Sequence, residues 1–124
     1  MKVKEVCFIG RKEVEPLRLF NVRHWYPGYR VTWASRGESP FEQQVEAFAR
    51  EYSIPFQRYT AAWGLHPIFQ TEARRDETMF SNADVVITSY SETEIIEEDP
   101  EAFRLLGEYQ RTVTPLTAKR RLNP

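Results

Sequence analysis

The order in which two hydrophobic patterns alternate along the chain limits its fold more than any other feature. Four runs rich in β-branched and aromatic residues, which are typical of strands, lie at 3–9, 29–34, 53–60 and 83–90. Segments whose apolar residues recur at helical spacing separate these runs. The alternation predicts an α/β fold, namely a single Rossmann-like three-layer domain over residues 1–124 with a mostly parallel sheet of four to five strands.

The helix after the second strand has the clearest start signal. Ser39 is in place to act as the N-cap, Pro40 suits the first helical position, and Glu42 completes an S-x-x-E capping box. An apolar face follows at helical spacing, formed by Val45, Phe48, Ala49 and Tyr52. The sequence therefore predicts that the loop "SRGES" at 35–39 connects a strand to a well-capped helix.

The remaining elements have weaker signals. Pro16 fits the first turn of a helix that would place Leu17 and Phe20 on one face. A polar helix is expected at 70–82, and Asp99-Pro100 marks the start of another. The stripe of that last helix has two alternatives, Phe103, Leu106 and Tyr109, or Leu105 and Tyr109. The segment "RTVTPLT" predicts a final strand at a sheet edge, because Pro115 removes a backbone donor.

The charge balance limits the partners that the chain can have. Its 17 basic and 18 acidic residues give a net charge of −1, whereas a general nucleic-acid binder has a basic excess. A local basic patch is compatible with this balance, and the segment 119–124 forms a basic tail. Acidic residues crowd into 92–101, for which a solvated acidic loop is the simplest interpretation.

The thiol and imidazole content gives no sign of a disulfide or a metal site. Cys7 is the single cysteine, lies in an apolar run and is expected to be buried and inert. A lone thiol fits a cytoplasmic location, and no apolar run has the length of a signal peptide core or a membrane span. His24 and His66 are far apart and have no cysteine at ligand spacing, so we expect neither a metal nor a cofactor.

Loops after the strands are where ligands bind in a parallel sheet, and two of them have suitable residues. Gly10 ends the first strand and Arg11 follows it, although a turn alone also explains this glycine. In "SRGES", Arg36 and Gly37 precede a helix start that would offer backbone donors to a phosphate. The alternative is a capped helix with no ligand, because Glu38 places negative charge at the same point.

Two further features have a structural and a functional interpretation. Arg74 and Arg75 are adjacent, so only one of them can readily face a cleft, and a solvated helix face is the simpler alternative. Trp33 and Trp63 lie beside two of the loops and could contact a base, but core packing is the commoner use of such residues.

The loops, taken in this order, resemble those of a known family. The quoted segments are "FIGRKE", "WASRGES", "REYSIPFQRYTAAWG", "RDETM" and "ADVVITSY". Over roughly residues 3–90 the chain resembles a divergent member of the SLOG superfamily, the Rossmann-like domains that include LOG-type phosphoribohydrolases and DprA-type proteins. It is most similar to the short YspA-like, YAcAr-type proteins of bacteria and phages.

The resemblance implies a binding site for a nucleotide-derived ligand. Gly10, Arg11, Arg36, Gly37 and Arg75 match ligand-binding positions of the family, and Ser35, which takes the place of an alanine, is the sixth residue of the predicted site. Trp33 and Ala34 stand where the family has two glycines, and Asp76 replaces an asparagine. The Pro-Gly-Gly-x-Gly-Thr motif of the LOG-type enzymes is absent, which favours a role without catalysis.

Three functions therefore follow from the sequence. The first is a binding module for a nucleotide or nucleotide-derived ligand at the carboxyl ends of the strands, with no general nucleic-acid binding and no membrane partner. The second is a nucleotide N-glycosidic hydrolase of the phosphoribohydrolase type, for which Glu38 is the candidate catalytic carboxylate. The third is a protein-interaction or assembly role on the same scaffold, which includes homo-oligomer formation.

Overall fold

The computed structural model of the chain describes residues 2–61, 68–91 and 93–116, with the backbone alone at 68–71. Strands and helices alternate along these residues, as the sequence predicts. The elements are β1 (Val3–Ile9), α1 (Pro16–Arg23), β2 (Arg30–Ser35), α2 (Pro40–Glu51), β3 (Phe56–Arg58), α3 (Ile68–Asn82), β4 (Val85–Thr88), α4 (Glu94–Glu98), α5 (Pro100–Glu108) and β5 (Val113–Pro115).

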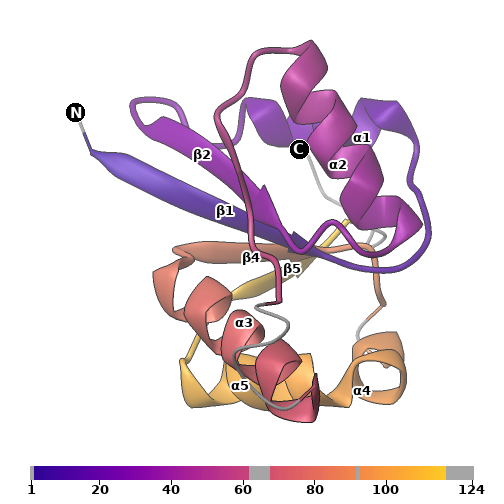
Figure 1. Cartoon of the computed structure of the whole chain (residues 1–124). Coiled ribbons are helices and arrows are strands. Elements are labelled where there is room, and N and C mark those ends of the chain that lie inside the picture. Colours follow the sequence, from indigo (N-terminus) through magenta and orange to yellow (C-terminus); the bar gives the residue numbers. More distant parts are fainter. Residues whose placement is uncertain (1, 62–67, 92, 117–124) are drawn as a thin grey trace.

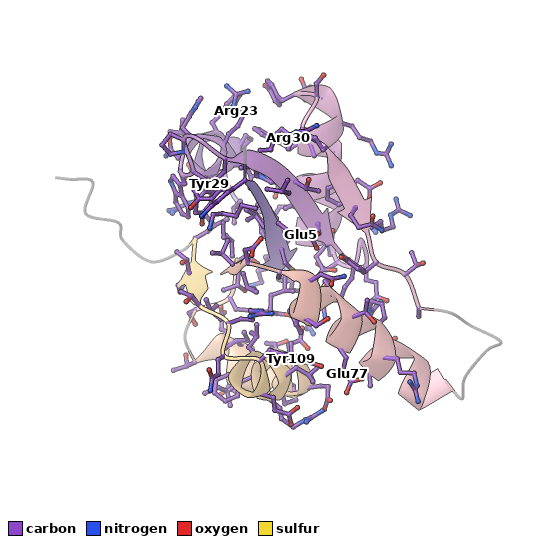
Figure 2. The ribbon with its side chains drawn as sticks, turned by 90° about the vertical axis from the view of Figure 1, so that its left-hand side faces the viewer. Glu5, Arg23, Tyr29, Arg30, Glu77 and Tyr109 are labelled. Atoms are coloured by element: carbon purple, nitrogen blue, oxygen red, sulfur yellow. The ribbon has the colours of Figure 1, made fainter. Side chains whose placement is uncertain are left out.

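The five strands form one parallel sheet in the order β3-β2-β1-β4-β5. Helices α1 and α2 cover one face, and α3, α4 and α5 cover the other (Figure 1). Figure 2 shows the same layering from the side, with Arg23 of α1 above the sheet, Glu5 within it, and Glu77 and Tyr109 below it. The fold is therefore the α/β three-layer arrangement that the sequence predicts, with five strands.

Each face of the sheet has its own hydrophobic cluster. Alternate residues of β1 divide between them, because successive side chains of a strand point to opposite faces. Phe8 packs with Trp33 of β2 against α2, whereas Cys7 and Ile9 pack against α3 and α5. Both clusters meet at β1, which is buried from Val6 onward. Cys7 is fully buried, as expected.

Some predictions of helix faces were wrong in detail. Leu17 is 67% exposed, and α1 buries Leu19 and Val22 in its place. For α5, Phe103 is 47% exposed, so the first predicted stripe is wrong, whereas the second is confirmed, because Leu105 is buried and Tyr109 packs against the same cluster. In both short helices an alternative stripe with the same helical spacing faces the sheet. Short helices contain too few turns for spacing alone to choose between neighbouring stripes.

Candidate functional site

A cleft of about 550 Å³ opens at the carboxyl ends of three strands. Gly10 and Arg11 follow β1, Arg36 and Glu38 follow β2, and Tyr90 follows β4, and all five residues line the cleft. From the central strand β1, the chain first adds strands on one side, β2 and β3, and then on the other, β4 and β5. The cleft therefore lies at the point where the strand order switches, which is where ligands bind in open parallel sheets.

Arg36 is at the centre of the charged network on the floor of the cleft. Its Nη2 atom lies 2.6 Å from Glu42 Oε2 and 2.9 Å from Asp99 Oδ2, and its Nη1 atom lies 3.5 Å from Asp76 Oδ2. Glu42 is fully buried and Arg36 is 9% exposed. Three carboxylates, one each from α2, α3 and the start of α5, thus bind the guanidinium group of Arg36.

The second arginine of the cleft is paired in the same way. Arg75 of α3 donates from Nε to Asp76 Oδ1 at 2.6 Å and from Nη1 to Glu38 Oε2 at 2.7 Å. The solvated face expected as the simpler alternative does not apply to Arg75, which is 7% exposed, but it does apply to Arg74. Helical geometry explains the difference, because adjacent residues point about 100° apart.

Burial and charge oppose each other in this network. Burial alone would lower the pKa of Arg36, but the charges of Glu42, Asp99 and Asp76 outweigh it and raise that pKa well above its ordinary value. Burial raises the pKa of the Asp76 carboxyl, although Arg36 and Arg75 act against the change. The surrounding carboxylates therefore favour the positively charged form of Arg36 despite its burial.

The acidic segment is not the solvated loop that its composition predicts. Residues 94–98 form α4, and Asp99 starts α5 with its carboxylate turned to Arg36. Glu98 lies 2.7 Å from Arg11 Nη1 across the cleft. Two carboxylates of the segment, on Glu98 and Asp99, thus pair with arginines that are distant in sequence, a relationship that has no local signature.

The backbone donors at the start of α2 are already partnered. Ser39 caps the helix, since its Oγ accepts from the Glu42 amide at 3.2 Å, and the Phe41 amide donates to the Arg11 carbonyl at 3.0 Å. The Glu42 side chain accepts from the Glu38 amide at 3.2 Å rather than from the N-cap residue. A phosphate at this helix start would have to displace one of these partners.

The two glycines of the predicted site have structural roles. A Cβ atom on Gly10 would lie 2.0 Å from Ser89 Oγ and 2.7 Å from Phe41 Cδ2, so the close packing of β1, β4 and α2 requires glycine there. Gly37 has a φ of +71°, a conformation that favours glycine. Its amide donates to Ser35 Oγ at 3.2 Å.

The structure brings most of the predicted site residues together. Gly10, Arg11, Arg36 and Arg75 line the cleft, and so does Glu38, the candidate catalytic carboxylate. The described lining does not include Ser35, which is fully buried, or Gly37.

Of the two tryptophans beside the loops, the structure describes Trp33 alone. Trp33 is 1% exposed and stacks on Phe48 in the cluster beneath α2, with ring centroids 5.6 Å apart, so it contacts no ligand in the cleft. Trp63 lies outside the described residues. Core packing, the commoner use of such residues, is thus the one that the structure shows for Trp33.

Sequence reasoning missed several residues that line the cleft. Asp99 appeared only as a helix start, and Asp76 only as a replacement for asparagine. Tyr90 was treated as the end of a strand, yet it lines the cleft and is 6% exposed. The strand end at Thr88 is the signal that could have identified Tyr90, because residues just past the strands form such sites.

A second hollow of about 530 Å³ lies on the α5 side of the sheet. It is lined mainly by apolar side chains, among them Ile95, Phe103, Leu106 and Val113. This apolar hollow is the surface available for the protein-interaction hypothesis, which stays a prediction. Within the described part of the chain, no group of three or more His, Cys, Asp and Glu residues is arranged to hold a metal ion.

Comparison with known proteins gives no match, either among the protein-family models or among the curated proteins. The resemblance to the SLOG superfamily therefore stays a prediction that rests on the quoted motifs. Among the helices of the described residues, none combines the length and apolar character that crossing a bilayer requires.

Proposed function

We propose that the protein is a binding module for a nucleotide-derived ligand, which lies in the cleft above Gly10 and Arg36. The observation that carries the proposal is the position of the cleft at the strand-order switch of a parallel sheet, between the ends of β1, β2 and β4. Its volume is within the range of small-molecule sites. Four cleft residues, Gly10, Arg11, Arg36 and Arg75, stand at positions that match ligand-binding positions of the SLOG superfamily, which supports a nucleotide-derived ligand.

The cleft offers many acceptors and few open cationic groups. Glu38, Asp76 and Asp99 present carboxylate oxygens, which accept hydrogen bonds from hydroxyl and amino groups. Arg36 and Arg75 already bind carboxylates. The ligand therefore places its sugar and base, rather than a chain of phosphates, within the cleft.

Thermal-shift screening against nucleosides and nucleotides tests this function. A ligand that binds only the folded protein raises the melting temperature by mass action. Arg11→Ala changes the cleft at a side chain that is 59% exposed, so it can be compared with the wild type without loss of the fold. The matched control is Lys12→Ala, one residue further along and outside this cleft. If no compound of either class shifts the melting temperature, the proposed function is wrong.

A second candidate function is hydrolysis of the N-glycosidic bond in such a ligand. Glu38 favours it, because its carboxylate lines the cleft and Arg75 holds it from one side at 2.7 Å. Water would add to the sugar carbon as the bond from that carbon to the base nitrogen breaks, so that the sugar gains the hydroxyl group and the base leaves with the proton, which Glu38 would transfer. Incubation with nucleosides and nucleoside monophosphates, followed by chromatography for free base, decides the question. Release that continues unchanged in Glu38→Gln would exclude Glu38 from this role.

A further inference from the structure

The charge balance of the cleft points to the kind of ligand that it accepts. Among its described lining residues are seven carboxylates and only three arginines, an excess of four negative charges. All three arginines are paired, Arg11 with Glu98, Arg36 with Glu42, and Arg75 with Glu38. A phosphate entering the cleft would meet net repulsion, whereas a positive charge would meet attraction.

Two of the seven carboxylates, those of Glu72 and Glu101, form the rim of the cleft. Glu72 of α3 and Glu101 of α5 line the cleft from two helices on the same face of the sheet, and both residues are exposed. Glu101 pairs with Arg104, which lies outside the cleft, and Glu72 has no ion pair within the described residues. Glu72 therefore keeps its full charge, whereas Arg104 offsets part of the charge of Glu101 from outside the cleft.

Tyr90 provides an independent sign that a ligand belongs in the cleft. Its side chain lines the cleft, the residue is 6% exposed, and its hydroxyl makes no hydrogen bond with any described residue. Buried hydroxyl groups normally have a partner, since an unsatisfied one costs free energy. No described residue accepts from or donates to the Tyr90 hydroxyl, so a ligand atom in the cleft can supply the missing partner.

We propose that the ligand is a nucleoside that carries a positive charge and no phosphate, and that it forms a hydrogen bond with the Tyr90 hydroxyl. This inference rests on the proposed function and specifies its ligand class. The positive charge lies among the carboxylates of the rim, near Glu72 and Glu101. The hydroxyl groups of the sugar donate to the carboxylates of the floor, and Tyr90 binds an acceptor of the ligand.

Isothermal titration calorimetry with four probes distinguishes the effect of a charged base on affinity from the effect of a phosphate. The probes are adenosine, adenosine monophosphate, nicotinamide riboside and nicotinamide mononucleotide. The cationic nicotinamide riboside should bind tightest, and each monophosphate should bind about tenfold more weakly than its nucleoside, a difference of about 1.4 kcal/mol. The affinity for nicotinamide riboside should also fall as salt is added, because salt screens exposed charges.

Substitutions of Glu72 and Glu101 test whether these carboxylates cause the preference for a cationic ligand. Glu72→Gln and Glu101→Gln each remove a negative charge at an exposed position, so both should fold. Each should weaken the binding of nicotinamide riboside by about threefold to tenfold and reduce the penalty of the monophosphate. The matched control is Glu77→Gln on the same helix α3 (Figure 2), which lies outside the described lining of the cleft and should change neither affinity.

Tyr90→Phe tests the hydrogen bond without changing the shape of the side chain. Affinity for the nucleosides should fall by about fivefold to tenfold, while the stability of the ligand-free protein should not fall, because no internal hydrogen bond is lost. A loss of stability with unchanged affinity would overturn the role of Tyr90. Tighter binding of the monophosphates would overturn the charge selectivity and leave the proposed function intact, whereas no binding of any probe would overturn both.

Discussion

Arg36 and Glu42 form an ion pair at 2.6 Å that is sealed from solvent, since Glu42 is fully buried and Arg36 is 9% exposed. Arg36 follows β2 and Glu42 lies in the first turn of α2, so the pair links a strand end to a helix start. Asp76 and Asp99 add contacts from the opposite side of the cleft. The guanidinium group of Arg36 therefore links both sides of the cleft.

Arg36→Met should lower the free energy of unfolding by about 3–5 kcal/mol, because it leaves the Glu42 carboxylate buried without its partner. Urea denaturation measures the change. Arg50→Ala serves as the control, because its ion pair with Glu46 involves an arginine that is 70% exposed and should contribute less than about 1 kcal/mol. Equal losses in the two variants would contradict the assigned importance of the buried network.

Gly10→Ala should destabilise the protein by about 1–3 kcal/mol, because the added methyl group would overlap Ser89 and Phe41. The double variant Gly10→Ala with Ser89→Gly should recover part of the loss, since it removes the nearest atoms. Gly107→Ala is the matched control, because no atom lies within 4 Å of the added Cβ. Thermal unfolding compares the three variants, and a Gly10→Ala variant as stable as Gly107→Ala would show that the site has room.

The local signals in the sequence predicted the strands, the N-cap at Ser39 and the layer order, because each depends on residues that are close together in the chain. They did not predict the partners of Arg36. Asp99 is 63 residues away from it, and the acidic composition around Asp99 is equally typical of a solvated loop. Tyr90 was missed for a related reason, since an aromatic residue at a strand end looks the same whether it packs in the core or lines a cleft.

Glu46 should make stability depend on pH in the acid range. Hydrogen bonds from Arg58 and Arg50 lower the pKa of its carboxyl below the ordinary value of 4.5, against the opposing effect of burial. The unfolded chain then binds more protons than the folded one, so this contribution is present above 4.5 and is lost as the pH falls through the folded pKa. Melting temperatures of the wild type and of Glu46→Gln should differ near neutral pH and converge in acid. A constant difference would exclude the effect.

The hydroxyl group of Tyr59 should lose its proton at a higher pH than that of an ordinary tyrosine. Burial is the main cause that raises its pKa from 10.0 to about 12, and its hydroxyl donates to Glu5 Oε2 at 2.7 Å. The raised pKa means that the unfolded chain loses this proton first, so stability falls as the pH rises above 10.0. Absorbance titration of the phenolate, with Tyr59→Phe for assignment, measures the shift. The late-ionising component should be absent from the variant.

Trp33 should be inaccessible to quenchers. It packs between Phe8 and Phe48, with ring centroids at 4.6 and 5.6 Å. In a variant in which Trp25 and Trp63 are replaced by Phe, the remaining emission should be blue-shifted and resist acrylamide. Ready quenching in the folded variant would contradict the buried position.

The sheet order has a consequence for the synthesis of the chain. All buried members of the cluster beneath α1 and α2, except Ile87 and Leu116, lie before residue 50. That cluster can begin to condense while β4 has yet to be made, and until then β1 has one unpaired edge. The pairing of β1 with β4 joins residues about 80 positions apart, a long-range contact of the kind that slows folding. The central strand can therefore pair with β2 before β4 has been made, and its second edge is completed only by a segment that is distant in the chain.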